Sequence, residues 1–339
     1  MKVEYIYRPP SAMVSIEKGF DSVIRCITKH EDIIPSKSFV KPFAFWPFTI
    51  IYNMVRYGLR SRCHRIFHIT GDIQYVGCFM NSKRTIMTVH DCVVLHNEAA
   101  SWFYKNLVYY LWYYLPLKHL KYICCISEET RKDLVTFFPW VEHKLTVVPS
   151  PVSDKFYNSP KQYNIKCPRI LHVGTRDNKN LPRVIQALEG LNCHLRIIGK
   201  LTEENVALLK SIAVDYSNDY NITDEQIVQE YIDADMISFP SLFEGFGMPI
   251  VEAQLVGRPV VTSDKEPMKT VGKGAMLVNP ESVESIREGF CRIMNSKEIW
   301  EQCVSEGLNN CQQYTAEKVA DKYYELYHQM TGEYQKRDL

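Results

Sequence analysis

Residues 238–253 read Ser238-Phe-Pro-Ser-Leu-Phe-Glu244-Gly-Phe-Gly-Met-Pro249-Ile-Val-Glu252-Ala253, and this stretch decides how the second half of the chain folds. An apolar run precedes it and a helical pattern follows it. Gly245 and Gly247 allow unusual backbone angles and a close approach to a ligand, while Pro249 suits the start of a helix. The stretch therefore predicts a strand, a turn and a helix N-terminus whose free N–H groups suit a phosphate.

Two carboxylates flank the predicted turn. Glu244 falls in the loop and Glu252 in the first turns of the helix, so the two side chains are expected on either side of the turn. Carboxylate oxygens accept hydrogen bonds from the hydroxyls of a sugar or a ribose. The alternative interpretation is a plain strand–turn–helix unit with two solvated glutamates.

Short apolar runs alternate with helical patterns along both halves of the chain. This alternation predicts an α/β protein with parallel sheets flanked by helices, and 339 residues favour two domains over one. The expected strands are Ile66–Ile69, Thr85–Val89, Tyr122–Ile126, Arg169–Val173, Leu195–Ile198, Met236–Phe239, Pro259–Thr262 and Ala275–Val278. Expected helices include Leu181–Leu188, Asp224–Ile232, Val283–Met294 and Ala316–Gln329.

The domain boundaries follow from a stretch without periodic pattern. Residues 147–168 are rich in proline, serine and polar residues, which is typical of a linker. We expect a first domain over 1–150, a linker over 151–167 and a second domain over 168–312. Residues 313–339 are expected to form a terminal helix that is free to pack on either domain, and its return to the first domain is the interpretation adopted.

Composition places the chain among ordinary globular proteins, with 46% hydrophobic and 23% charged residues. Eleven cysteines are scattered without a C-x-x-C pair, which indicates reduced thiols, and a zinc site would need ligands from distant segments. The start, MKVEYIYRPP, has a charge pattern and prolines that do not suit a secretory signal, and no run of 18 apolar residues predicts a membrane span. A cytoplasmic location is therefore expected.

The first half of the chain is basic. Residues 1–150 hold 19 Lys and Arg against 12 Asp and Glu, a net charge of +7. Residues 39–64 combine aromatic and basic side chains and have two interpretations: a surface at a membrane interface, or a core helix with a solvated cationic end. The side chains concerned are Phe43, Phe45, Trp46, Phe48, Arg56, Arg60 and Arg62, with Arg65 just beyond.

The glutamate motif at 244–252 resembles the hallmark of the retaining family 4 glycosyltransferases of the GT-B fold. Further stretches resemble motifs of that family in the same order along residues 60–315. They are Phe67–Ile73, Thr88–Asp91, Ile126–Glu128, Ile170–Leu181, Ile197–Lys200, Pro259–Ser263 and Leu277–Pro280. The resemblance implies a GT-B architecture, in which two Rossmann-like domains have parallel sheets that face a central cleft.

The resemblance also implies roles for individual residues. Lys179 would bind the donor diphosphate and stabilise the charge on the leaving phosphate, and Arg176 is a weaker candidate for that task. His90 would lie beside the anomeric carbon of the donor sugar. Glu244 would contact sugar hydroxyls and Glu252 the ribose. The other donor-binding positions implied are Gly174, Thr175, Gly199, Lys200, Gly245, Phe246, Gly247 and Met248, and those on the acceptor side are Gly71, Asp72 and Asp91.

The expected reaction is transfer of a hexose with retention of anomeric configuration. No Asp-x-Asp metal motif is recognised, and a lysine and helix N–H groups can replace a divalent ion, so we expect no metal and no cofactor beyond the nucleotide-sugar co-substrate. The resemblance favours a GDP-mannose-like donor, with UDP- and dTDP-sugars open, and a glycan or lipid-linked acceptor in O-antigen or capsule synthesis. A second hypothesis is a catalytically silent sugar-nucleotide-binding partner. A nicotinamide-dependent enzyme is disfavoured because no G-x-G-x-x-G opens a predicted strand–helix unit. No nucleic-acid partner is expected.

Overall fold

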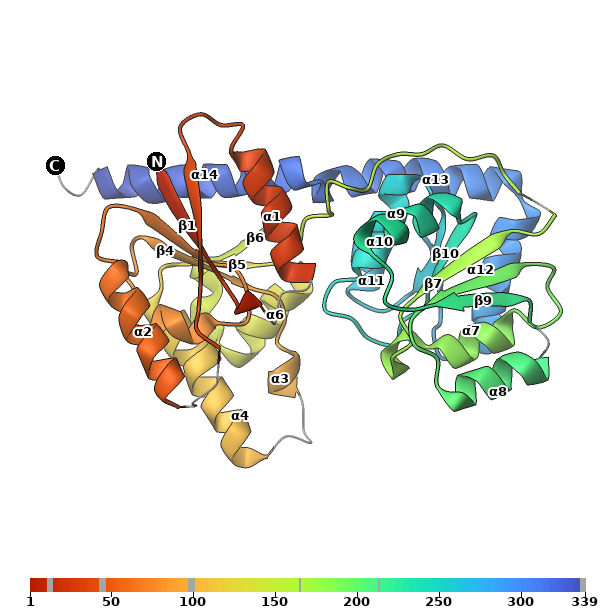
Figure 1. Ribbon diagram of the computed structural model, residues 1–339, viewed down its shortest axis with the longest axis horizontal. Helices are drawn as coiled ribbons and strands as arrows, with labels where there is room; N and C mark the ends of the chain where they lie inside the picture. Colours follow the sequence, from red (N-terminus) through yellow and green to blue (C-terminus); the bar gives the residue numbers. More distant parts are fainter. Residues whose placement is uncertain (11–14, 43–46, 97–100, 165, 213, 336–339) are drawn as a thin grey trace. The chain divides into compact units, whose positions relative to one another are not determined.

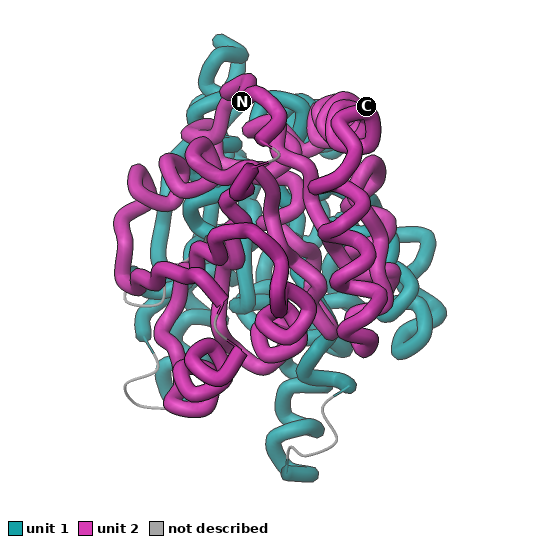
Figure 2. Tube along the Cα trace, turned by 90° about the vertical axis from the view of Figure 1, so that its right-hand side faces the viewer, with its two compact units in different colours: residues 1–151, 316–339 teal, residues 152–315 magenta. Residues whose placement is uncertain are grey.

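The computed structural model describes residues 1–10, 15–42, 47–96, 101–164, 166–212 and 214–335 (Figure 1). The chain forms two compact units, Met1–Pro151 with Ala316–Leu339 (unit 1) and Val152–Thr315 (unit 2), which Figure 2 shows in two colours. Each unit contains a six-stranded sheet in which all the paired strands run parallel. Parallel strands with helices between them are the α/β arrangement that the sequence predicts.

The sheet of unit 1 has the strand order β2-β1-β3-β4-β5-β6. Its strands are β1 (Lys2–Tyr7), β2 (Ile34–Phe39), β3 (Ile66–Ile69), β4 (Thr85–Val89), β5 (Tyr122–Cys125) and β6 (Leu145–Val147). The predictions for β3 and β4 are confirmed, and β5 ends one residue earlier than expected. The order reverses direction between β1 and β3, so the loops after these two strands diverge at the carboxyl edge of the sheet.

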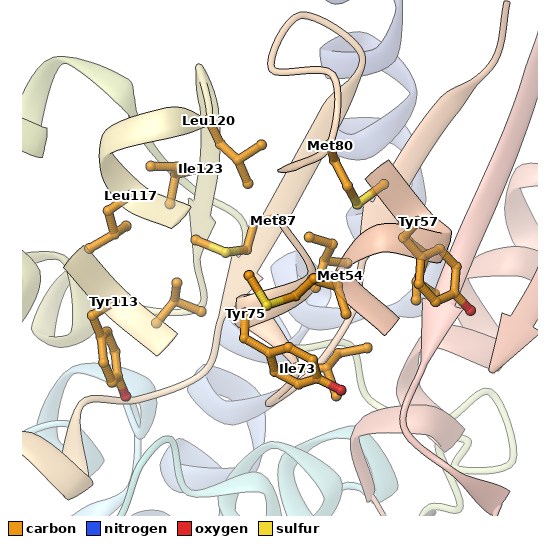
Figure 3. Close-up of a cluster of buried hydrophobic side chains, with 14 of the residues drawn as sticks. Met54, Tyr57, Ile73, Tyr75, Met80, Met87, Tyr113, Leu117, Leu120 and Ile123 are labelled. Carbon is orange, nitrogen blue, oxygen red and sulfur yellow. The ribbon is translucent and has the colours of Figure 1, made fainter. Parts of the chain in front are cut away.

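Helices cover both faces of this sheet. On one face, α1 (Ser15–Ile27) and α14 (Ala316–Gln335) pack together, and Tyr327 Oη lies 2.7 Å from His68 Nδ1 of β3. On the other face, α2 (Phe48–Arg60) contributes Met54 and Tyr57 to a core of aliphatic and aromatic side chains (Figure 3). The remaining helical elements are η2 (Gln74–Phe79), α3 (Val93–His96), α4 (Trp102–Val108), η3 (Tyr109–Tyr114), α5 (Leu115–His119), α6 (Glu128–Phe137) and η4 (Pro139–Lys144).

The sheet of unit 2 has the order β12-β11-β10-β7-β8-β9. Its strands are β7 (Arg169–Val173), β8 (His194–Ile198), β9 (Tyr216–Asp219), β10 (Met236–Phe239), β11 (Val260–Ser263) and β12 (Met276–Val278). The strands predicted at β7 and β10 are confirmed. Those at β8, β11 and β12 differ from the prediction by one residue at one or both ends, and β9 was not predicted. Its helices are η5 (Asp177–Lys179), α7 (Leu181–Ala187), α8 (Glu203–Ile212), α9 (Asp224–Asp233), α10 (Met248–Val256), α11 (Met268–Val271), α12 (Val283–Asn295), α13 (Lys297–Cys311) and η6 (Gln312–Tyr314).

The segment from Val152 to Pro168, expected to contain the linker, contacts unit 2 along its length. The N–H of Val152 donates to the carbonyl of Tyr314 at 2.8 Å, and Lys161 pairs with Asp235 at 2.9 Å. These contacts place the described residues of the segment with the second sheet, although the segment has no regular secondary structure over most of its length.

Candidate active site

The strand order of unit 2 reverses between its two central neighbours, β7 and β10. Ile237 of β10 pairs with Leu171 of β7 on one side and with Val260 of β11 on the other. Open α/β sheets bind ligands at such a reversal, outside the carboxyl ends of the strands. The loop after β7 carries Lys179 and the loop after β10 carries Glu244, so the topology brings two of the predicted site residues to one place.

Lys179 and Glu244 form an ion pair at this place. Lys179 Nζ lies 2.6 Å from Glu244 Oε1, and the two side chains are only 11% and 13% exposed. The same ammonium lies 4.5 Å from the centre of the Phe239 ring, which adds a cation–π contact. Partial burial strengthens the electrostatic interaction between the two charges.

Two asparagines join the loops that carry this pair. Asn178 Nδ2 donates to the carbonyl of Phe243 and to Glu244 Oε1, both at 3.1 Å. Buried Asn180 donates to the carbonyls of Pro240 at 2.9 Å and Pro280 at 2.6 Å. Sequence reasoning assigned neither residue a role. The available signal was Asn180 before a helix that begins Leu-Pro, a position at which asparagine tolerates the left-handed backbone seen here, with φ of 63°.

The loop after β7 packs tightly because of its glycines. Gly174 has φ of +95°, and a Cβ on it would lie 3.0 Å from Lys179 Cγ. Gly199, at the end of β8, would place a Cβ 2.7 Å from Thr175 Cγ2. Thr175 in turn donates its hydroxyl to the carbonyl of Lys200 at 2.7 Å. These contacts direct the lysine side chain over Gly174 toward Glu244, whereas the side chain of Lys200 is exposed, as is that of Arg176.

The predicted glycine turn is present at the start of α10. Gly247 is the N-cap with φ of 100°, and Pro249 lies in the first turn of the helix. Phe246 is buried edge-on against Tyr314, with 5.6 Å between ring centres. Among the described residues, the backbone N–H groups of residues 245–248 donate a hydrogen bond to no protein acceptor. A helix of nine residues preceded by such a turn offers N–H donors to an anion.

Glu252 lies one turn further along α10 and is partly buried. The hydroxyl of Tyr231 donates to its Oε2 at 2.8 Å. Burial raises the pKa of Glu252 to about 7, against the opposing effects of the Tyr231 hydrogen bond and the Lys179 charge. Tyr231, the hydrogen-bond partner of Glu252, is a site residue that the sequence did not reveal. The glutamate is therefore poised to ionise near neutral pH and to accept hydrogen bonds when it does.

Replacing Glu252 by glutamine is expected to stabilise the ligand-free protein at alkaline pH. Since the folded pKa of about 7 exceeds the ordinary value of 4.5, the wild-type protein loses stability as pH rises from about 4.5 to about 7. Glu252→Gln removes that loss, so the free energy of unfolding should increase by about 1–3 kcal/mol at about pH 8 and remain unchanged near about pH 4. Denaturant titrations at the two pH values measure this difference.

The matched control is Glu281→Gln. Glu281 is exposed, and its hydrogen bond with Lys265 lowers the pKa of its carboxyl, so this variant should not gain stability at alkaline pH. Equal behaviour of the two variants would show that burial of Glu252 has no energetic effect.

In unit 1, His90 follows β4 and is buried. Its Nε2 lies 2.7 Å from the carbonyl oxygen of Thr70. Because a carbonyl can only accept, Nε2 carries the proton, and in the neutral ring Nδ1 is the acceptor. The hydrogen bond fixes the ring at the carboxyl edge of the sheet, which is the edge at which ligands bind in such folds.

The predicted acceptor-side residues gather at the same edge. Arg8, after β1, donates to Asp72 at 3.3 Å and pairs with the buried Glu17 at 2.6 Å, and its side chain packs beside Gly71. Burial raises the pKa of Asp91. Asp72 and Asp91 both line a cavity of about 640 Å³. Its other walls are mostly apolar and consist of Gln74, Val93, Val94, Phe103, Tyr104, Leu107, Val108, Trp112 and Tyr113.

Contrary to the expectation above, the chain contains one Asp-x-Asp sequence, Asp233-Ala-Asp235. Asp235 lies at the amino end of β10, away from the edge that carries Glu244. It is tied to Lys161 at 2.9 Å, to the N–H of Arg169 at 2.7 Å and to Asn164 at 3.0 Å. These contacts give it a structural role. The described residues contain no group of three or more His, Cys, Asp or Glu side chains arranged to hold a metal.

Comparison with known proteins supports this description of unit 2. Residues 167–296 match the sequence profile of the family described as glycosyl transferases group 1, and this range contains the Lys179–Glu244 pair and the glycine turn. This match identifies a group 1 glycosyltransferase domain within unit 2. Within the described residues, no helix is both long enough and apolar enough to cross a bilayer.

Relatives and solved structures extend the comparison. The chain is 26% identical to an MMP alpha-(1->4)-mannosyltransferase of Mycolicibacterium hassiacum over 62% of its own length and spans 56% of the relative's length. It is 23% identical to O-antigen chain mannosyltransferase B of Escherichia coli over 72% and 70% of the two chains. The structure of Anabaena HepE in complex with UDP and glucose has a TM-score of 0.74 and 12% identity, covering 97% of this chain and 100% of that one. That likeness shows a shared GT-B fold.

Proposed function

We propose that this protein transfers a hexose from a nucleotide diphosphate sugar to a glycan or lipid-linked glycan, with retention of anomeric configuration, in the synthesis of a surface polysaccharide. Glycosyl transfer agrees with the family of residues 167–296, and polysaccharide synthesis agrees with the relative named for the O-antigen chain. The observation that carries the proposal is the Lys179–Glu244 pair beside the glycine turn of α10.

In this proposal, Lys179 exchanges its carboxylate partner for the donor diphosphate. The phosphate oxygens also accept from the backbone N–H groups of residues 245–248 at the start of α10. As the bond to the sugar breaks, negative charge grows on the leaving phosphate, and fixed donors in a partly buried site stabilise that charge. Glu244, released from the lysine, accepts hydrogen bonds from sugar hydroxyls. Glu252, once ionised, accepts from the ribose.

The acceptor binds in unit 1 in this proposal. Asp72 and Asp91 offer carboxylate oxygens to acceptor hydroxyls, while the aromatic walls of the cavity suit the apolar face of a sugar or a lipid. His90 is assigned to the anomeric centre, where its fixed ring orients the reacting sugar. No residue takes the role of a covalent nucleophile, so catalysis rests on positioning and charge stabilisation, and no metal ion is required.

A GDP-mannose-like donor is favoured over UDP- and dTDP-sugars. Two relatives are named mannosyltransferases, at 26% and 23% identity. The structures of HepE contain UDP, glucose or UDP-glucose, but at 12% or 13% identity they bear on the fold alone.

A donor panel tests the proposal. The protein is incubated with GDP-mannose, UDP-glucose, UDP-galactose and dTDP-rhamnose, and released nucleoside diphosphate is quantified by mass spectrometry with and without glycan acceptors. We expect one of these donors to be consumed, and GDP-mannose is the donor we favour. Its consumption should rise when an acceptor is present. Binding of a donor without release of a nucleoside diphosphate under any condition would favour the silent sugar-nucleotide-binding partner instead.

A further inference from the structure

Helix α2 exposes a second apolar face. At about 100° per residue, its exposed apolar side chains fall within an arc of about 100° along the whole helix. They are between 45% and 75% exposed and comprise Phe48, Ile51, Tyr52, Val55 and Leu59. We call these five residues the outer stripe. Scattered exposed apolar residues are ordinary, but a continuous row on one helix face is not.

The opposite face of the same helix lies in the protein core. Ile50, Met54 and Tyr57 are buried, and Figure 3 shows Met54 and Tyr57 among the labelled core side chains that include Tyr75 and Met80. Gly58 faces Phe79 so closely that a Cβ on the glycine would lie 3.0 Å from Phe79 Cβ. The core interpretation of residues 39–64 is therefore confirmed for one face of α2 and leaves the outer stripe unexplained. Phe43, Phe45 and Trp46 lie outside the described residues.

The sequence segment that contains the outer stripe carries charges of one sign. Residues 33–71 contain six Lys and Arg and no Asp or Glu. Lys41 Nζ lies 4.3 Å from the ring centre of Tyr52 in the stripe. Arg60, at the end of α2, pairs with buried Glu4 at 2.8 Å, whereas exposed Arg62 has no ion-pair partner among the described residues.

A small basic cavity lies just beyond the end of α2. It measures about 260 Å³ and its lining includes His64, Arg65 and Arg84, together with Lys2 and Lys83. Arg84 donates to the carbonyl of Cys63 at 3.0 Å, which fixes the cavity to the loop that follows the helix. Cations so arranged beside an apolar row favour an anionic surface.

We propose that the outer stripe and these cations dock unit 1 on an anionic lipid bilayer. An apolar stripe on a helix enters the boundary between headgroups and acyl chains, while flanking lysines and arginines contact lipid phosphates. The absence of acidic residues over residues 33–71 favours lipid over a second copy of this chain, because the exposed cations would then face one another. This inference does not depend on the proposed reaction.

Vesicle flotation tests the proposal. Wild-type protein should float with vesicles of phosphatidylcholine containing one-third phosphatidylglycerol and should bind pure phosphatidylcholine at least tenfold more weakly. The double variant Val55→Ser with Leu59→Ser should reduce the affinity for anionic vesicles at least tenfold. Arg62→Glu should reduce it about 25-fold, because each charge contributes about fivefold. High salt should weaken wild-type binding.

The control is Tyr220→Ser, which removes an exposed aromatic side chain in unit 2 and should not alter binding. Transfer to a water-soluble acceptor should remain at the wild-type rate in every variant, which separates this proposal from the catalytic one. Absence of binding to anionic vesicles, or equal binding by wild type and the stripe variant, would overturn the proposal. A wild-type dimer that the stripe variant converts to a monomer would also overturn it, in favour of a second copy.

Discussion

Replacing Lys179 by alanine is expected to lower the rate of sugar transfer about 100- to 1,000-fold, the loss typical of removing one group that stabilises developing charge in a secluded site. The lysine is only 11% exposed and its position is fixed by Gly174, Phe239 and Glu244, so no neighbouring cation can take its place without rearrangement. Steady-state kinetics with the donor identified by the panel measure the effect. Most of the loss should fall on kcat, because leaving-group charge is greatest in the transition state.

The matched control for this variant is Lys265→Ala. Lys265 also pairs with a glutamate of unit 2, Glu281, but on the exposed surface. Its removal should leave the transfer rate within about twofold of wild type, because exposed pairs contribute little. Lys179→Arg should recover part of the lost rate, since the charge remains while its geometry changes. A Lys179→Ala enzyme with wild-type kcat would refute the role assigned to this lysine.

Replacing Glu244 by glutamine is expected to have the second largest effect, a loss of about 100-fold in kcat/KM. Glutamine keeps the shape and the contact with Asn178 but cannot supply two charged acceptor oxygens to sugar hydroxyls. It also removes the negative charge that faces the Lys179 ammonium at 2.6 Å, which should lower the free energy of unfolding by about 1–3 kcal/mol in the absence of ligand. Saturating nucleoside diphosphate should restore much of that stability by supplying a new anion.

A double-mutant cycle separates cooperation from independent effects. If Lys179 and Glu244 act on one donor, the doubly substituted protein should lose far less activity than the product of the two single losses. The corresponding cycle for Lys265 and Glu281 provides the comparison. If the double variant instead loses as much activity as the product of the two single losses, Lys179 and Glu244 serve separate ligands.

The strands that the sequence predicted correctly are short, apolar and bounded by polar residues. β10 (Met-Ile-Ser-Phe) and the middle of β7 (Ile170 and Leu171) are apolar because both faces of a parallel sheet are covered by helices. β1 was missed although it pairs with a strand on each side. Its Glu4 breaks the apolar pattern, and only the structure shows that Arg60 and Arg65 neutralise that buried carboxylate at 2.8 and 2.9 Å.

Edge strands escaped prediction for another reason. β9 has the sequence Tyr-Ser-Asn-Asp and lies at the edge of its sheet. It pairs with β8 alone, and its side chains are partly exposed. β2 also lies at an edge and contains Pro35. Neither has the apolar composition that sequence reasoning requires, because an edge strand buries less surface.

The sequence predicted those parts of the candidate site that are built from neighbouring residues in the chain. It did not predict the parts that depend on residues far apart in the chain. The glycine turn of α10 follows from residues next to one another in sequence. The roles of Asn178, Asn180 and Tyr231 depend on partners between 21 and 100 residues away. Such contacts are set by the strand order, which places the loop after β7 beside the loop after β10, and no short window of sequence contains that information.

Calorimetric titration with nucleoside diphosphates tests most directly whether Lys179 and the start of α10 bind a diphosphate. We predict that wild-type protein binds one of GDP, UDP and dTDP and binds the corresponding nucleoside at least about tenfold more weakly. Lys179→Ala should reduce the affinity for the diphosphate to near that of the nucleoside. Equal affinity of wild type and Lys179→Ala for every nucleoside diphosphate would contradict it.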